Sequence, residues 1–249
     1  MNEKDLRQTV LALAGRYLGA KTDDQAQHIL IDAYNSFFVG HYPRGYKLKY
    51  TDAWCQPFVE AIAIMSNLAD LFPAECGCQE ALNLAKQAGT YRDLTYTPQP
   101  ADVIYFDRNP DGWSDHTGFV KEVKDGKIYT IEGNAQGDEC RENVYDKTDV
   151  IICGYVAPDY ASKVTDGFPW TGTVQTSVNL RTSPVNLGPM NYCNVESPEG
   201  SPIRHVLLKG ETVKVIGEHG NWWNVEVTGR YTWKPWCAKY DSGKDIIKG

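Results

Sequence analysis

Apolar residues recur at helical spacing through the first third of the chain. The pattern predicts a helix over residues 3–18, whose apolar face consists of Leu6, Val10, Leu13 and Tyr17. A second helix is predicted over residues 23–35, with Asp23 as its N-cap. The same spacing continues behind Cys55 through Phe58, Ile62, Met65 and Leu68. Cys55 is therefore expected at or just before a helix N-terminus, and a further short helix is expected over residues 79–88.

From residue 101 the hydrophobic period changes to two, which predicts strands over residues 102–106, 117–123, 127–133 and 150–156. Lys124-Asp125-Gly126 separates the middle two strands and is typical of a hairpin. Because helices come first and antiparallel strands follow, the predicted fold class is α+β.

The region between residues 158 and 172 is rich in Pro, Ser, Asp and Gly and predicts a linker. Beyond it only short strands are predicted, over residues 172–182, 203–208, 211–217, 222–227 and 230–233, a pattern typical of a small β-barrel. Charge divides in the same place: residues 1–160 hold 15 Lys/Arg and 24 Asp/Glu, and residues 161–249 hold 10 and 8. We therefore expect a first domain at 1–160, a linker at 161–171 and a second domain at 172–249.

Composition excludes several classes of protein. The chain of 249 residues is 42% hydrophobic and 23% charged, a balance typical of a globular protein. No apolar run is long enough to span a membrane, and the net charge of -7 argues against a general nucleic-acid binder. Glu3 and Asp5 stand where a signal peptide would carry positive charge. We expect a monomer made in the cytoplasm without a signal peptide and without membrane insertion.

The seven cysteines are an odd number, which favours reduced thiols over a disulfide scaffold. Cys76-Gly77-Cys78 lacks a second pair at zinc spacing, so we expect a tight turn with small buried thiols. The run from Asp107 to Gly112 fits the first half of a calcium loop, and Asp115 could add an oxygen, but the closing Glu is missing. We favour an acidic Asx-turn loop and no cofactor. Calcium is the open alternative, held by Asp107, Asn109 and Asp111.

Four polar residues in three segments of the chain could cooperate chemically. Cys55 precedes a helix whose N-terminus stabilises a thiolate. His116 begins one predicted strand, and Glu132 and Asn134 end the next. A cysteine nucleophile needs a base to take its proton and a third group to orient that base. These positions supply one of each.

Four motifs occur in an order and spacing that resemble CHAP domains, the cysteine, histidine-dependent amidohydrolases/peptidases: AWCQPFV at 53–59, PQPADVIYFD at 98–107, DHTGFV at 115–120 and YTIEGN at 129–134. The resemblance implies a papain-like or NlpC-type catalytic domain that cleaves an amide bond of peptidoglycan. It implies that Cys55 is the nucleophile, His116 the general base, Glu132 the residue that orients the imidazole, and Asn134 a further polar support.

Around this site we expect substrate contacts from Trp54, Tyr50 and Trp113, with the Tyr50 hydroxyl as a donor to the oxyanion. The remaining thiols of the Cys-Gly-Cys turn, Cys76 and Cys78, are expected to be dispensable for activity.

The C-terminal motifs SVNLRTSP at 177–184, LKGETVKV at 208–215 and NWWNV at 221–225 resemble bacterial SH3-like domains, and residues 185–202 resemble an insertion. Such domains accompany wall hydrolases, which implies wall binding by Trp222, Trp223, Tyr231 and Trp233. The combination implies an N-acetylmuramoyl-L-alanine amidase or peptidoglycan endopeptidase of the phage or prophage endolysin type. The alternatives are an amidase toxin delivered to rival cells and a non-catalytic wall-binding or phage-structural protein.

The hairpin tests the assignment of Glu132. A two-residue turn at Asp125-Gly126 would place Phe119 opposite Glu132 and turn that carboxylate away from His116. A three-residue loop over residues 124–126 would place Gly118 opposite Glu132 and His116 opposite Asn134. Catalytic geometry therefore predicts the three-residue loop, a positive φ at Gly126, and a hydrogen bond from Glu132 or Asn134 to the imidazole.

Overall fold

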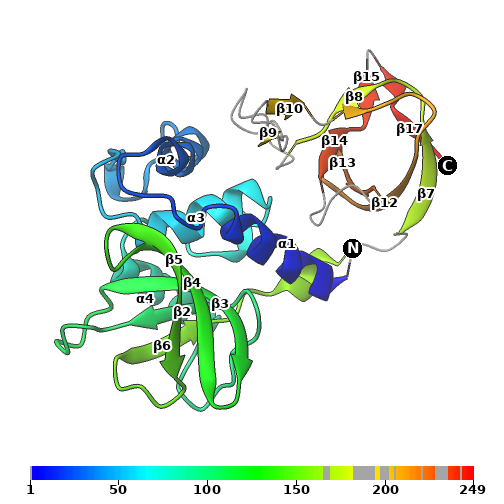
Figure 1. The fold of residues 1–249 in the computed structure, drawn as a ribbon. Coiled ribbons are helices and arrows are strands. Elements are labelled where there is room, and N and C mark those ends of the chain that lie inside the picture. The colour runs from blue at the N-terminus through cyan, green and yellow to red at the C-terminus, as the bar shows by residue number, and fades with distance from the viewer. Residues whose placement is uncertain are drawn as a thin grey trace. The chain divides into compact units, whose positions relative to one another are not determined.

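The computed structural model describes residues 2–164, 169–181, 194–196, 202–204, 206–219, 221–227, 235–241 and 243–249 (Figure 1). The chain forms two compact units. The first consists of Val10–Ile64 and Leu68–Ser162, and the second lies mainly from Lys163 onward. The sequence-based domain limits stay a prediction. No helix in the described ranges is long and apolar enough to cross a membrane.

Four α-helices form where the apolar spacing predicts them: α1 (Glu3–Gly15), α2 (Gln25–Phe37), α3 (Cys55–Met65) and α4 (Cys78–Ala88). Short 3₁₀ turns lie at Pro43–Gly45, Ala69–Leu71 and Tyr160–Lys163. The N-cap of α2 is Asp24 rather than Asp23, since the Asp24 carboxylate accepts a hydrogen bond from the Gln27 N–H at 2.7 Å. Every residue of α3 is buried, which fixes the helix that carries Cys55.

The catalytic candidate region is built on one six-stranded antiparallel sheet of order β1-β6-β2-β3-β4-β5. Its strands are β1 (Tyr91–Arg92), β2 (Val103–Phe106), β3 (His116–Lys124), β4 (Lys127–Ala135), β5 (Glu139–Asp146) and β6 (Ile152–Val156). The α+β class is confirmed, but β1 and β5 were not predicted. Buried hydrophobic residues of this sheet form a core cluster. Its members are Ile104, Phe106, Val120, Ile128, Ile152 and Tyr155.

The second unit contains a five-stranded antiparallel sheet of order β14-β13-β12-β7-β17. Its strands are β7 (Trp170–Val174), β12 (Thr212–His219), β13 (Trp222–Glu226), β14 (Trp236–Ala238) and β17 (Ile247–Lys248). Short pairs accompany it: β8 (Val178–Asn179) with β11 (Val206–Leu207), β9 (Asn194–Glu196) with β10 (Pro202–Arg204), and β15 (Tyr240–Asp241) with β16 (Lys244–Asp245).

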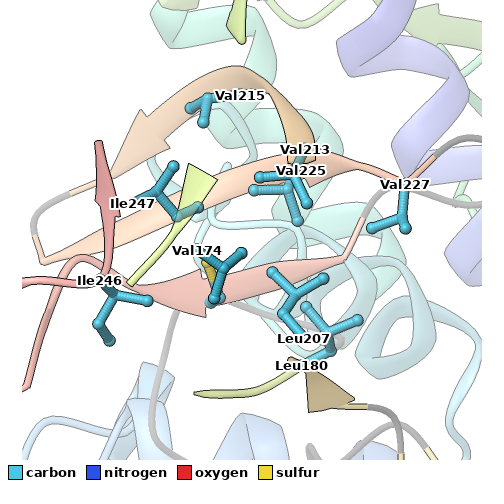
Figure 2. Close-up of a cluster of buried hydrophobic side chains, with 10 residues drawn as sticks. Val174, Leu180, Leu207, Val213, Val215, Val225, Val227, Ile246 and Ile247 are labelled. Atoms are coloured by element: carbon cyan, nitrogen blue, oxygen red, sulfur yellow. The ribbon is translucent and has the colours of Figure 1, made fainter. Parts of the chain in front are cut away.

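Aliphatic side chains from these strands form a buried core (Figure 2), among them Val174, Leu180, Leu207, Val213, Val225 and Ile247. The alternating pattern of short strands is thus realised as an antiparallel β unit, and its assignment as an SH3-like barrel stays a prediction. Tyr231, Trp233, Cys193 and most of the 185–202 segment lie outside the described residues.

Candidate active site

The β3–β4 hairpin places the site residues, and it does so by a different route from the predicted one. Lys124 pairs with Lys127, so the turn has two residues, Asp125 and Gly126, with φ of 52° and 75°. Two positive φ values are typical of a type I′ turn. The predicted three-residue loop is therefore wrong, although the positive φ at Gly126 is confirmed.

A β-bulge restores the register that the chemistry needs. The pairing shifts between Val120 and Glu122, so that one extra residue lies on β3 and Phe119 pairs with Ile131. Gly118 consequently lies against Glu132, and a Cβ added at Gly118 would lie 2.5 Å from the Glu132 Cγ. The absence of a side chain at Gly118 thus leaves the space through which Glu132 reaches the imidazole.

His116 and Glu132 form a fully enclosed pair. The His116 Nε2 lies 2.9 Å from the Glu132 Oε2, and each side chain is only 1% exposed. His116 begins β3 and pairs with Phe106 of β2, whose ring stacks near the imidazole with centroids 5.8 Å apart. The expected hydrogen bond between the imidazole and the carboxylate is present, and Nε2 is the nitrogen that it uses.

Three further side chains hold the Glu132 carboxylate, and sequence reasoning missed all of them. The Thr130 hydroxyl donates to Oε1 at 2.5 Å, while Asn143 Nδ2 and the Tyr145 hydroxyl donate to Oε2 at 2.8 and 3.2 Å. Asn143 and Tyr145 lie on β5, and Asn143 pairs with Thr130 across the ladder. The sequence of β5, ECRENVYD, is mostly polar and carries no clear alternation that would have indicated a strand.

Asn134 does not take the predicted supporting position. It lies at a register irregularity between β4 and β5, with a left-handed φ of 51°. Among the described hydrogen bonds none joins its side chain to His116 or Glu132. The structure therefore brings Asn143, rather than Asn134, to the Cys55–His116–Glu132 group.

Cys55 is the first residue of α3, where the N–H groups of a helix have no partner within the helix. Cys55 is 7% exposed, and its thiol and the His116 imidazole shift the pKa values of each other. Since Nε2 of His116 is bound to Glu132, Nδ1 is the ring nitrogen left for a thiol or a substrate. Nδ1 is buried and has no hydrogen-bond partner among the described residues.

The pKa values of the pair favour opposite charges. The hydrogen bond from Cys78 is the largest effect that lowers the pKa of Cys55 well below its usual value; burial opposes it, and His116 and the Gln56 N–H add to it. Burial would lower the pKa of His116, but hydrogen bonds with Cys55 and Glu132 outweigh burial and raise it to about 9. The resting state at neutral pH is therefore a thiolate beside an imidazolium.

Cys78 is a neighbour of Cys55 that the sequence did not reveal. The two sulfur atoms are 3.5 Å apart, and both side chains are buried. The expectation of small buried thiols holds for Cys78, but its placement against Cys55 argues against its being dispensable. Cys76 is half-buried, and its sulfur instead accepts a hydrogen bond from the Arg44 guanidinium at 3.3 Å.

Two of the three residues predicted to contact the substrate have their polar groups hydrogen-bonded to other side chains. Trp54 is completely buried, and its indole N–H donates to the Thr22 hydroxyl at 2.9 Å. The Tyr50 hydroxyl donates to Asp32 at 2.9 Å and its ring stacks on His28, so it is not placed as an oxyanion donor. Trp54 is a core residue, and its indole meets the Phe58 ring of α3 edge-on with centroids 6.3 Å apart. Trp113 is 59% exposed, and its substrate role stays a prediction.

The acidic loop before His116 is held together by its own N–H groups. Asp107 accepts from the N–H groups of Asp111 and Gly112, and Asp115 accepts from Arg108 and from the Asn109 side chain. These are the contacts of an Asx-turn loop. Within the described ranges no group of three acidic, His or Cys side chains could hold a metal ion, and calcium binding by Asp107, Asn109 and Asp111 stays a prediction.

The two described candidates for wall binding differ. Trp223 packs against the core of the second unit, meets Trp170 edge-on at 5.4 Å and carries the Lys239 ammonium 4.2 Å from its ring centroid. Trp222 is half-buried, with the Arg181 guanidinium 6.0 Å from its ring. Both side chains are half-buried; Trp223 is mainly structural because it packs against the core, and wall binding by Trp222 stays a prediction.

Comparisons with known proteins identify one domain. No curated protein matches the chain. Among solved structures, "The crystal structure of Ly7917" is 15% identical and covers 100% of this chain and 97% of its own, with a TM-score of 0.33. "The crystal structure of Ly7917 with the hydrolyzing product of MDP" is 14% identical and covers 100% and 98%, with a TM-score of 0.33.

A TM-score of 0.33 does not establish a common fold, so the assignment rests on the family match and on the site. The CHAP domain family matches residues 43–134, a range that includes Cys55, His116 and Glu132. These residues are therefore similar to the CHAP domain family, and the match covers less than half of the chain.

Proposed function

We propose that the protein hydrolyses an amide bond of bacterial peptidoglycan with Cys55 as the nucleophile. The observation that carries this proposal is the buried hydrogen-bonded pair of His116 and Glu132 beside a thiol at a helix N-terminus. Nucleophile, base and orienting group are the parts that amide hydrolysis by a cysteine enzyme needs. The CHAP match supports peptidoglycan as the substrate class.

In the proposed reaction the Cys55 thiolate attacks the carbonyl carbon of the amide. The N–H groups at the start of α3 hold the oxyanion that forms, because they have no partner within the helix. The imidazolium of His116 gives its Nδ1 proton to the leaving amine, and the amine departs. His116, now neutral, takes a proton from water, and the resulting attack on the thioester releases the acid and restores the thiolate.

Glu132 acts through His116 in this scheme. Its carboxylate accepts a hydrogen bond from the Nε2–H, which fixes the ring with Nδ1 toward the thiol and stabilises the imidazolium. Thr130, Asn143 and Tyr145 in turn fix the carboxylate. The cleaved bond is either the muramoyl–L-alanine amide or a peptide bond of the stem or cross-bridge. We propose that the protein is a phage or prophage endolysin that acts on the cell wall.

Replacement of the nucleophile tests the chemistry. Cys55→Ala should lose wall lysis by a factor of about 10³ or more, because no other described thiol lies beside His116. Cys76→Ala is the matched control and should keep most of the wild-type activity, because the Cys76 sulfur accepts a hydrogen bond from Arg44. Turbidity of purified walls gives the rate, and mass spectrometry of the fragments gives the bond. Near wild-type lysis by Cys55→Ala would refute the nucleophile.

A second test concerns wall binding by the second unit. We propose that Trp222 contributes to it, so Trp222→Ala should reduce cosedimentation of the full chain with intact walls about tenfold. The catalytic rate on soluble muropeptides should not change. Trp223→Ala is the comparison variant, and it should lower the unfolding temperature because Trp223 packs against the core. Unchanged wall affinity of Trp222→Ala, with the fold intact, would remove Trp222 from the binding surface.

A further inference from the structure

The thiol of Cys55 lies beside a second thiol that undergoes no bond change in the proposed hydrolysis. Cys55 and Cys78 are the first residues of α3 and α4, and their sulfur atoms lie 3.5 Å apart. Both are free thiols, each 7% exposed, within the same compact unit. Among the described cysteines no other two sulfur atoms are joined by a hydrogen bond.

The two sulfurs differ in charge as a redox pair requires. Cys55 is held as a thiolate by Cys78, His116 and the Gln56 N–H, and a thiolate is the form that attacks a peroxide. The pKa of Cys78 is raised well above its usual value, by the hydrogen bond with Cys55 and by burial, so Cys78 stays protonated. The site therefore presents an attacking sulfur with a protonated thiol in direct contact.

We propose that Cys55 and Cys78 form an oxidation site for hydrogen peroxide, in which Cys78 resolves the oxidised nucleophile. The Cys55 thiolate attacks one peroxide oxygen and the O–O bond breaks, giving Cys55 sulfenic acid and hydroxide. The Cys78 sulfur then attacks the Cys55 sulfur, the S–O bond breaks, and water leaves with the thiol proton. The product is a Cys55–Cys78 disulfide, and a dithiol reductant supplies the two electrons and two protons that reverse it.

The geometry allows the bond with small movements. A disulfide has sulfurs about 2.05 Å apart, so the present separation must shorten by about 1.5 Å. Gly77, the N-cap of α4, has no side chain that would hold Cys78 in place, and no side chain caps this helix end. Formation of the bond removes the nucleophile from His116, which stops hydrolysis. It also protects Cys55 from further oxidation to sulfinic acid, which dithiols do not reverse.

The first experiment maps the bond on the full-length wild-type protein and does not depend on wall hydrolysis. The protein is treated with hydrogen peroxide, free thiols are blocked with N-ethylmaleimide, and peptides are analysed by mass spectrometry without reduction. We expect a linked peptide pair that contains Cys55 and Cys78 and has lost two hydrogen atoms. Cys55 with two or three added oxygens and an unmodified Cys78, or a link from Cys55 to Cys76, would overturn the proposal.

The second experiment follows recovery of activity on walls after peroxide and then dithiothreitol, and so rests on the proposed function. Wild type should recover most of its own starting rate. Cys78→Ser should recover at least about tenfold less of its own starting rate, because its Cys55 passes to sulfinic acid. Cys76→Ser, the matched control, should recover like wild type. Equal recovery of Cys78→Ser and wild type would overturn the resolving role, whereas lysis by Cys55→Ala would overturn the proposed function and leave the mapped disulfide standing.

Discussion

Two glutamates of the first unit are almost equally buried, but their pKa values are shifted in opposite directions. Glu132 on β4 is 1% exposed, and Glu60 on α3, five residues after Cys55, is 0% exposed. Burial would raise the pKa of Glu132, yet hydrogen bonds from His116, Thr130 and Asn143 lower it below its usual value. The pKa of Glu60 is raised well above its usual value by burial and, secondarily, by the charge of Glu75.

The difference lies in the number of donors that reach each carboxylate. Glu132 receives four hydrogen bonds, from His116, Thr130, Asn143 and Tyr145. Neither oxygen of Glu60 has a hydrogen-bond partner among the described residues. Burial penalises a charge, and only donors that replace water can offset that penalty. His116, Thr130 and the β5 donors therefore favour the ionised form of Glu132, whereas the raised pKa of Glu60 favours its neutral form.

Of the two glutamates, Glu132 should have the larger effect on activity when its charge is removed. Glu132→Gln should lower kcat by about 10²–10⁴-fold, because the amide does not stabilise the imidazolium. The pH profile separates this role from a structural one. In wild type, activity should fall above about pH 9, where His116 loses its proton. In the variant the pKa of His116 loses the raising effect of Glu132, so the alkaline limb should move to lower pH.

The control for that variant is Glu142→Gln, which removes an exposed carboxylate of β5 that pairs with Lys121 at 2.7 Å. Its pH profile should match that of wild type. If Glu132→Gln lost activity but kept the wild-type alkaline limb, Glu132 would support the fold and not the charge of His116.

The raised pKa of Glu60 should make the free energy of unfolding depend on pH. Glu60→Gln should increase the free energy of unfolding relative to wild type as pH rises. The folded-state pKa of Glu60 lies above its value of 4.5 in the unfolded chain, so the folded form binds the extra proton. The contribution of Glu60 to stability is fully present below pH 4.5 and is lost as pH rises toward the folded-state pKa, at up to about 1.4 kcal/mol per pH unit.

Urea unfolding at several pH values measures this difference. The gain of Glu60→Gln should be smallest at pH 4.5 and should grow toward neutral pH. Glu122→Gln, at an exposed position of β3, serves as the control. Its effect on the free energy of unfolding should not increase with pH. A gain independent of pH would mean that Glu60 is ionised in the folded protein, which would erase the contrast with Glu132.

The local parts of this site were predictable from sequence, and its long-range parts were not. The helix that begins at Cys55 follows from apolar spacing and the hairpin from Asp125-Gly126, because both signals lie within a few neighbouring residues. The β3 bulge has no such signal, since one extra residue in an alternating run leaves the hydrophobic pattern almost unchanged. The correct face for Glu132 was therefore predicted with the wrong turn.

Contacts between distant segments account for the remaining differences. Cys78 meets Cys55 only because α3 and α4 begin side by side, and a separation of 23 residues does not indicate this. Asn143 reaches Glu132 through the pairing of β4 with β5, and β5 is mostly polar because one of its faces is exposed. Trp54 was expected at the substrate because it precedes the nucleophile, but tertiary packing buries it against Phe58.

The smallest effect should come from the donors around Glu132 and decides which asparagine supports it. Asn143→Ala removes a hydrogen bond of 2.8 Å to a charged oxygen, worth about 1.5 kcal/mol, so kcat/KM should fall about tenfold. Asn134→Ala, the matched control, should stay within about twofold of wild type, because no described hydrogen bond joins Asn134 to the pair. A larger loss in Asn134→Ala than in Asn143→Ala would return the supporting role to Asn134 and remove β5 from the account of why Glu132 is ionised.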